Sequence, residues 1–232
     1  MDVKLINIHK HFGKVHANNG INLAVPGGTI PGILGENGAG KSTLMKVLSG
    51  FIGLDEGQIL LDGRSVRISS PVDAIRQGIG MLHQDPLDFP PMRVLENFVL
   101  GHEGGLFFDL SAARKEFQKL QNQFDMRLSP DAYVDTLTVG ERQQLEILRL
   151  LWLGARVLIL DEPTTGISAA QKEKLFQTLQ VLAGQGMTVI FVSHKLEDVE
   201  RLCSRVAVLR RGELVGEQQA PFDIDGLVEL GG

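Results

Sequence analysis

The sequence predicts an α/β fold built on a mainly parallel sheet, with an α-helical segment inserted in its middle. Three observations lead to this fold class. In the last third of the chain, apolar runs typical of buried strands, such as residues 157–160, alternate with helical patterns. A glycine-rich loop after residue 34 links a short apolar strand to a helix. Residues 94–153 are mostly helical in pattern, so this segment interrupts the alternation.

The opening third contains several expected strands. Residues 5–8 and 21–25 alternate between polar and apolar side chains, as half-buried strands do. Residues 30–34 form a short apolar run, in which Pro31 is awkward for a central strand because it has no N–H to donate. Further strands are expected at residues 58–61, 66–68, 79–82, 188–192 and 206–209.

The expected helices carry apolar faces at helical spacing. After Ser111, one such face is made by Ala113, Phe117, Leu120 and Phe124, and a second helix repeats the pattern at Leu145, Leu148, Leu151 and Trp152. Ser168 and Gln171 form a capping box that begins a third helix, to about residue 184. Other helices are expected at residues 41–49, from Pro71 onward, and at 195–202.

Composition excludes several classes of protein. The chain has 232 residues, 43% of them hydrophobic, and a formal net charge of -5. A net negative chain without clustered Lys and Arg does not fit nucleic acid as its main partner. The longest apolar stretch, residues 145–160, is interrupted by charged residues and glycine, and residues 1–10 lack the apolar core of a signal peptide. One cysteine, Cys203, fits a reducing compartment. We therefore expect a cytosolic protein that acts at a membrane, if at all, through another protein.

The loop Gly35-Glu36-Asn37-Gly38-Ala39-Gly40-Lys41-Ser42 matches the pattern G-x-x-x-x-G-K-S. Glycines let successive backbone N–H groups approach a phosphate, and the helix N-terminus adds its positive dipole end. Lys41 can reach the outer phosphates, and the Ser42 hydroxyl can bind Mg²⁺. The alternative is a glycine-rich turn without a ligand. Since the loop lies between a strand and a helix, the sequence predicts a nucleoside triphosphate site, with ATP as the nucleotide.

Two carboxylates, Asp161 and Glu162, directly follow the apolar run at residues 157–160. Ligands of α/β sheets bind outside the carboxyl ends of the strands, so this pair is expected beside the phosphates. Asp161 would hold Mg²⁺ through water, and Glu162 would polarise the attacking water. The alternative is an ordinary acidic pair after a core strand. The separation of Lys41 from Asp161 exceeds what one βαβ unit needs, and the helical middle accounts for the excess.

In these motifs and their order the chain resembles the ATP-binding cassette, the ATPase domain of ABC transporters. The resemblance covers residues 1–232 as one domain. It implies a P-loop NTPase core, an N-terminal antiparallel β subdomain and an inserted α-helical subdomain at about residues 92–153. Gln84 matches the Q-loop glutamine, residues 137–141 (Leu-Thr-Val-Gly-Glu) occupy the position of the family signature, and His194 matches the switch histidine.

The resemblance assigns roles to individual residues. Catalysis is implied for Glu162, His194, Gln84 and Lys41, and Mg²⁺ binding for Ser42, Gln84 and Asp161. Nucleotide contacts are implied for Phe12, Gly35, Glu36, Asn37, Gly38, Ala39, Gly40, Lys41, Ser42 and Thr43, and for Thr138, Val139, Gly140 and Glu141 of a facing cassette. For Phe12, which would stack on adenine, a core position is the alternative. For His194 the alternative is a structural hydrogen bond at the end of a strand.

The sequence departs from the family pattern in two places. The signature has Val139 for a glycine and Glu141 for a glutamine, and Ser168 stands where many cassettes have an aspartate. These variants, together with residues 35–48 and 70–75, resemble the importer branch that takes up simple sugars and nucleosides. In that branch one polypeptide often carries two cassettes, so this chain is expected to be one half or to pair with a second copy.

The resemblance implies an ATPase that drives solute import from the cytoplasmic side of the inner membrane. Its partners would be a second cassette, transmembrane permease subunits and, indirectly, a solute-binding protein. Two alternatives are a soluble cassette ATPase acting on nucleic acid or ribosomes, which the charge does not favour, and a hydrolysis-impaired nucleotide-binding cassette, which the altered signature suggests.

Several other residues are open to interpretation. His9 and His11 suggest a metal pair, but a solvated strand end is the simpler interpretation. Cys203 and Trp152 are expected to pack in the core. The pair Phe107-Phe108 fits either an exposed contact for a membrane partner or the core of the helical insertion.

Overall fold

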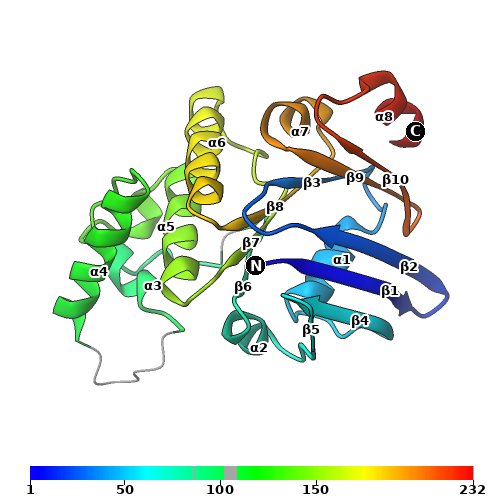
Figure 1. Cartoon of the computed structure of the whole chain (residues 1–232). Coiled ribbons are helices and arrows are strands. Elements are labelled where there is room, and N and C mark those ends of the chain that lie inside the picture. The colour runs from blue at the N-terminus through cyan, green and yellow to red at the C-terminus, as the bar shows by residue number, and fades with distance from the viewer. Residues whose placement is uncertain (86, 102–108, 232) are drawn as a thin grey trace.

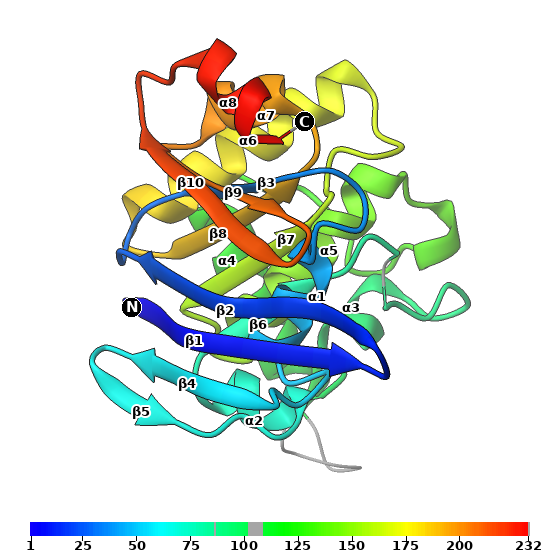
Figure 2. The ribbon, with the colours of Figure 1, turned by 90° about the vertical axis from the view of Figure 1, so that its right-hand side faces the viewer.

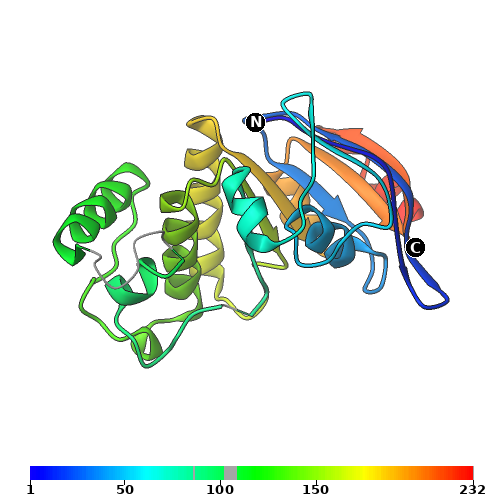
Figure 3. The same ribbon diagram turned by 90° about the horizontal axis from the view of Figure 1, so that it is seen from below.

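Two β-sheets and a group of helices make up the protein. The computed structural model describes residues 1–85, 87–101 and 109–231; the pair Phe107-Phe108 lies outside them. Figure 1 shows the two sheets on one side of the molecule and α3, α4 and α5 on the other. Figure 3, seen from below, shows these helices extending to one side as an arm, of which α5 packs against β6 of the larger sheet.

The larger sheet has six strands in the order β10-β9-β3-β8-β7-β6. All neighbours are parallel except β10, which pairs with β9 in antiparallel fashion, so the expected mainly parallel sheet is confirmed. The strands are β3 (Pro31–Leu34), β6 (Ile79–Leu82), β7 (Val157–Asp161), β8 (Thr188–Ser193), β9 (Arg205–Arg210) and β10 (Glu213–Gln219).

The smaller sheet is antiparallel, in the order β2-β1-β4-β5. Its strands are β1 (Val3–Phe12), β2 (Val15–Val25), β4 (Glu56–Leu61) and β5 (Arg64–Val66). It confirms the antiparallel subdomain that the family resemblance implied. Figure 2 shows this sheet beneath the larger one. The two sheets are joined where Asn19 of β2 donates its backbone N–H to the Gly212 carbonyl, 2.7 Å away.

The strands differ from the sequence prediction at two points, and the structure explains the proline in β3. The bounds of the strand expected at residues 66–68 are wrong: β5 pairs with β4 across the Asp62-Gly63 turn, begins at Arg64 and ends at Val66. Pro31 is the first residue of β3, where a missing N–H costs least, and this explains how a central strand tolerates it. Strand β10 gave no sequence signal, because its edge position leaves alternate side chains half-exposed rather than buried.

Strands of the larger sheet divide their side chains between two hydrophobic clusters. In β7, Val157 and Ile159 face the cluster shared with the antiparallel sheet, whereas Leu158 and Leu160 face the helices. Because side chains alternate along a strand, a fully apolar strand must be covered on both faces. One cover is α1 together with the antiparallel sheet, and the other is formed by the remaining large helices.

Eight α-helices lie in the described part of the chain. They are α1 (Lys41–Leu48), α2 (Pro71–Arg76), α3 (Val94–Phe98), α4 (Leu110–Gln123), α5 (Val139–Trp152), α6 (Ala169–Gly184), α7 (Leu196–Leu202) and α8 (Ile224–Gly231), and a 3-10 turn covers Val134–Thr136. The sequence did not predict α8. Pro71 occupies the first turn of α2, as expected. Within the described residues, no helix has both the length and the apolar character needed to cross a membrane.

Three aromatic rings form the centre of the helical arm. Phe98 of α3 is fully buried, packs edge-on against Phe117 of α4 at 5.0 Å between ring centroids, and stacks on Trp152 of α5 at 4.5 Å. Trp152 is half-buried: it packs against the core from its edge and also lines a surface hollow, so the expected core position holds only in part. The three rings come from three different helices, so this contact fixes how the helices of the arm pack together.

Phe98→Ala is expected to lower the free energy of unfolding by about 3–5 kcal/mol, because it leaves a cavity between three helices. Thermal and urea unfolding measure this loss. The control is Phe89→Ala, at a side chain exposed to solvent, which should cost less than about 1 kcal/mol. Equal losses for the two variants would show that Phe98 does not organise the arm.

Candidate nucleotide site

A cavity of about 420 Å³ lies at the carboxyl ends of the parallel strands. It collects the loop after β3, Gln84 after β6 and Glu162 after β7. Its lining residues are Val15, His16, Ala17, Asn37, Gly38, Gly40, Lys41, Ser42, Thr43, Gln84, Glu162, Arg211 and Gly212. The structure thus brings together one side of the predicted site from segments far apart in the sequence.

Glycine is required at two points of the loop. A Cβ at Gly35 would lie 2.3 Å from the Leu209 carbonyl oxygen, and one at Gly40 would lie 2.5 Å from the Ala17 carbonyl oxygen. Gly40 also has φ 101°, which side chains disfavour, and it caps α1. The loop is therefore pressed against β9 and the β1–β2 hairpin, and α1 begins where a phosphate would bind.

Lys41 is buried, with 5% of its surface exposed. Its Nζ donates to the carbonyl oxygens of Gly35 at 2.7 Å and Glu36 at 2.9 Å, and lies 3.9 Å from Glu162 Oε1. Burial lowers the pKa of Lys41, and the charges of Glu162 and Asp161 oppose that shift. These contacts hold the ammonium group between the loop and the carboxylates, where a triphosphate would meet it.

Glu162 and His194 form a hydrogen-bonded pair. His194 Nδ1 lies 2.8 Å from Glu162 Oε2, and since an ionised carboxylate only accepts, the Nδ1–H donates. Glu162 has φ 49°, an unfavourable conformation for a non-glycine residue, and its N–H donates to the Val192 carbonyl at 3.0 Å. The strand edge holds the glutamate in this strained position, with its carboxylate turned to the histidine.

Two carboxylate oxygens of this region are buried without a hydrogen-bond partner among the described residues. They are Asp161 Oδ1 and Glu162 Oε1. A buried carboxylate oxygen without a hydrogen bond is costly. A cation or an ordered water beside the phosphate loop would remove this cost.

Phe12 is not a core residue. Half of its surface is exposed, at the tip of the β1–β2 hairpin whose next residues line the cavity. The core alternative is therefore wrong. The Phe12 ring lies on the hairpin that forms the rim of the cavity, with Lys10 Nζ 5.5 Å from its centroid.

The signature residues lie elsewhere. Thr138, Gly140 and Glu141 line a separate hollow with Gln171 and other residues of α6, not the phosphate cavity. Thr138 caps α5 by accepting from the Glu141 N–H at 3.3 Å, and Glu141 Oε2 accepts from the Thr138 N–H at 2.8 Å. The unusual Glu141 thus completes a capping box, and the start of α5 lies outside the phosphate cavity.

Sequence reasoning missed five of the lining residues. Val15, His16 and Ala17 come from β2, and Arg211 and Gly212 from the β9–β10 turn. Asn18 supports this wall, because its buried amide donates to the Gly40 carbonyl at 3.0 Å. The Arg-Gly turn was visible in the sequence, but only the pairing of β9 with β3 brings it to the loop.

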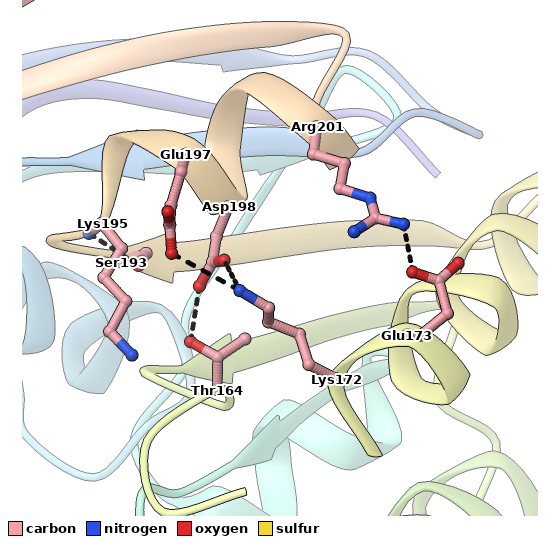
Figure 4. A network of polar contacts seen from close by, with 8 residues as sticks. All are labelled: Thr164, Lys172, Glu173, Ser193, Lys195, Glu197, Asp198 and Arg201. Carbon is pink, nitrogen blue, oxygen red and sulfur yellow. Dashed lines mark hydrogen bonds and ion pairs between the residues drawn. The ribbon is translucent and has the colours of Figure 1, made fainter. Parts of the chain in front are cut away.

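A polar network ties the loop after Glu162 to two helices (Figure 4). The Thr164 hydroxyl donates to Asp198 Oδ2 at 2.7 Å, and Lys172 Nζ of α6 donates to Asp198 Oδ1 at 2.8 Å. Asp198 is 1% exposed. Ser168, in place of the family aspartate, caps α6 by accepting from the Gln171 N–H at 3.2 Å, so the predicted capping box is confirmed. Ser168 therefore keeps a capping oxygen but lacks the charge.

The histidines of the antiparallel sheet are joined by a third. His16 Nε2 lies 3.0 Å from His9 Nδ1, and its ring stacks on His11 at 3.8 Å between centroids. Among the described residues no group of three side chains has the geometry to hold a metal ion. Cys203 is buried, as expected, and burial raises the pKa of its thiol well above the usual range.

The fold and the site define a nucleotide-binding cassette: a parallel sheet with a phosphate loop, a carboxylate–histidine pair and a helical arm. The model of the ABC transporter family matches residues 18–165, and the chain belongs to that family.

Known relatives are about twice as long as this chain. The ribose import ATP-binding protein RbsA of Chromobacterium violaceum is 40% identical over 99% of this chain and 47% of its own length. The nucleoside import ATP-binding protein NupA of Lactococcus lactis is 38% identical over 92% of this chain and 42% of its own length. The glucose import ATP-binding protein TsgD13 of Haloferax volcanii is 40% identical over 92% of this chain and 44% of its own length.

Solved structures share the whole fold. The ADP conformation of MJ1267, an ATP-binding cassette of an ABC transporter, has a TM-score of 0.87 at 26% identity, covering 99% of this chain and 98% of that one. CbiO1 of Clostridium perfringens, part of the ABC transporter complex cbiONQ, has a TM-score of 0.82 at 26% identity. The match covers 94% of this chain and 88% of that one. The ATP-binding cassette MJ0796, solved as a dimer bound to ADP and phosphate, has a TM-score of 0.79 at 23% identity. The match covers 95% of this chain and 99% of that one.

Asp198→Asn is expected to lower the free energy of unfolding by about 2–3 kcal/mol, because it weakens two charge-assisted hydrogen bonds at a buried position. Urea unfolding measures the change. Glu197→Gln is the matched control: Glu197 contacts the same Lys172 Nζ at 3.5 Å but is 76% exposed, so its loss should be small. If Glu197→Gln is as damaging as Asp198→Asn, the network does not depend on the buried carboxylate.

Proposed function

We propose that the chain binds ATP with Mg²⁺ and hydrolyses it to drive solute import, as the motor subunit of an ABC transporter. The observation that carries the proposal is the convergence of the phosphate loop, Gln84 and Glu162 on one cavity, with His194 hydrogen-bonded to Glu162 from beside it. The names of the relatives favour a simple sugar or a nucleoside as the solute class.

The residues present fit Mg²⁺. Ser42, Gln84 and Asp161 offer a hydroxyl, an amide and a carboxylate oxygen, the hard donors that this ion prefers. The partnerless Asp161 Oδ1 is an atom that a cation or its water would satisfy. When bound, the ion would neutralise charge on the outer phosphates. Lys41 and the N-terminus of α1 would hold the phosphates in place from the protein side.

Hydrolysis needs a base for the attacking water. The free Oε1 of Glu162 would accept its proton, while Oε2 remains fixed by His194. The strained backbone of Glu162 would contribute by positioning the carboxylate. His194 would direct its remaining ring nitrogen to the γ-phosphate.

The site is completed by a second cassette. Thr138, Val139, Gly140 and Glu141 lie outside this chain's cavity, so they would serve the ATP of a partner. The chain spans about half the length of its relatives, and the partner is then the other half of a longer polypeptide or a second copy. Phe12 would stack on the adenine at the rim.

The membrane partner would bind between the arm and the sheets. A hollow of about 850 Å³ lies there, bounded by α2, β6 and α5. Apolar and aromatic side chains line it, among them Phe51, Val72, Leu87 and Trp152. A short helix of a permease subunit fits such a groove. The chain would thus work on the cytoplasmic side of the inner membrane, as a peripheral subunit, with the solute-binding protein as an indirect partner.

Lys41→Ala is expected to weaken ATP binding at least about tenfold, because the phosphates lose a buried charge-assisted contact. Fluorescent-nucleotide titration of the purified chain measures this. Lys46→Ala, on an exposed position of the same helix, is the control and should bind as the parent does. Unchanged affinity in Lys41→Ala would refute the role of the loop.

Glu162→Gln should leave ATP binding intact and lower turnover by about 10²–10⁴-fold, because the water loses its base. Turnover is measured in the complex purified from membranes, with the exposed Glu200→Gln as control. Turnover at the parent rate would refute the base assignment. A parent complex that binds ATP but shows no single-turnover hydrolysis would instead support the hydrolysis-impaired alternative.

A further inference from the structure

An ion pair joins the Q-loop segment to the start of the signature helix. Asp88, four residues after Gln84, accepts from Arg142 Nε at 2.6 Å and from Arg142 Nη2. The side chain of Asp88 is 4% exposed and that of Arg142 26%, so the pair is shielded from solvent. The hydrogen bond from Asp88 raises the pKa of Arg142, which keeps the guanidinium charged. Two parallel bonds also fix the orientation of the partners, which a single contact does not.

The position of Arg142 makes the pair unusual. Arg142 lies in the first turn of α5, directly after Glu141, and a cation near a helix N-terminus is unfavourable. Asp88 offsets this cost by supplying a buried counter-charge. The start of α5 therefore depends on a residue of another segment.

The segment that follows Asp88 is hydrogen-bonded to the helical arm. Phe89 donates its backbone N–H to Asn97 Oδ1 of α3 at 2.8 Å, and its carbonyl accepts from Asn97 Nδ2 at 3.2 Å. Gln84, in contrast, follows β6 directly and lines the phosphate cavity. Gln84 at the nucleotide site and Asp88 at the signature helix are thus only four positions apart in the sequence.

A second contact ties the same turn of α5 to the carboxylate side of the site. Gln143 is buried, and its Nε2 donates to the Pro163 carbonyl at 2.6 Å, next to Glu162. The adjacent residues Arg142 and Gln143 thus hold the signature helix to both edges of this chain's own nucleotide site. Both contacts therefore end in the turn that bears the signature.

We propose that Asp88 is a positioning residue which, through Arg142, makes the first turn of α5 follow the Q-loop. Binding of ATP in one cassette would then set the orientation of the signature that serves the other. This inference rests on the proposed ATP-binding function. Removal of the ion pair between Asp88 and Arg142 would separate ATP binding from the response of the signature. ATP binding would persist, whereas the response of the first turn of α5 would be lost.

Hydrogen exchange of the chain tests the proposal, in the Glu162→Gln background with and without Mg·ATP. In the parent, nucleotide is expected to slow or speed exchange in residues 134–145 by about tenfold. Asp88→Asn should lose most of that response, while its ATP affinity and the nucleotide response of α1 stay within about twofold of the parent. The charge-swapped double variant, Asp88→Arg with Arg142→Asp, should regain the response.

The matched control is the bidentate pair of Arg114 and Asp131, also in the helical arm, with bonds of 2.6 and 3.0 Å. Asp131→Asn should leave the response intact. A parent-like response in Asp88→Asn, or equal loss in both variants, would overturn the positioning role. A parent that binds ATP without any response at residues 134–145 would overturn the link but leave the proposed function standing. Failure of the parent to bind ATP would overturn the proposed function, and the link with it.

Discussion

The edge at which the parallel strands end is the constraint on which the rest of the site depends. Leu34 pairs with Ser193 and Asp161 with Val192, so β3, β7 and β8 end at one level. The phosphate loop, the carboxylates and His194 follow these ends directly. Their proximity is a consequence of strand register, since a slip of one residue would turn every side chain to the opposite face. The two hydrophobic clusters enforce that register, because each strand is apolar on both faces.

The structure concentrates its unfavourable features at this edge. Glu162 is strained, Lys41 is buried, and the oxygens Asp161 Oδ1 and Glu162 Oε1 have no hydrogen-bond partner among the described residues. Elsewhere, buried charges are paired, as Asp198 is with Lys172 and Thr164. Such a contrast is expected of a site shaped for a highly charged ligand, which would satisfy the groups that the protein alone does not.

The helical arm and the site are connected by few but specific polar contacts. Asp88 with Arg142, and Gln143 with the Pro163 carbonyl, join α5 to both sides of the nucleotide cavity. The aromatic contacts of Phe98 hold the helices of the arm together, and the same hydrophobic cluster continues to the helix-covered face of the larger sheet. The groove proposed for a membrane partner is bounded by α5 of the arm and by α2 and β6.

The sequence by itself determined the fold class, the phosphate-loop motif and the candidate residues for the chemistry. Local patterns suffice for these, because a loop motif and an apolar period are properties of neighbouring residues. It left Phe12 undecided, misplaced the strand at residues 66–68, and gave no signal for β10, whose pattern is polar at the sheet edge. Only the tertiary structure brought Arg211 and Gly212 to the cavity, placed the signature away from it, and paired Asp88 with Arg142. Each of these depends on which strands and helices become neighbours in space, a choice made by packing over the whole chain.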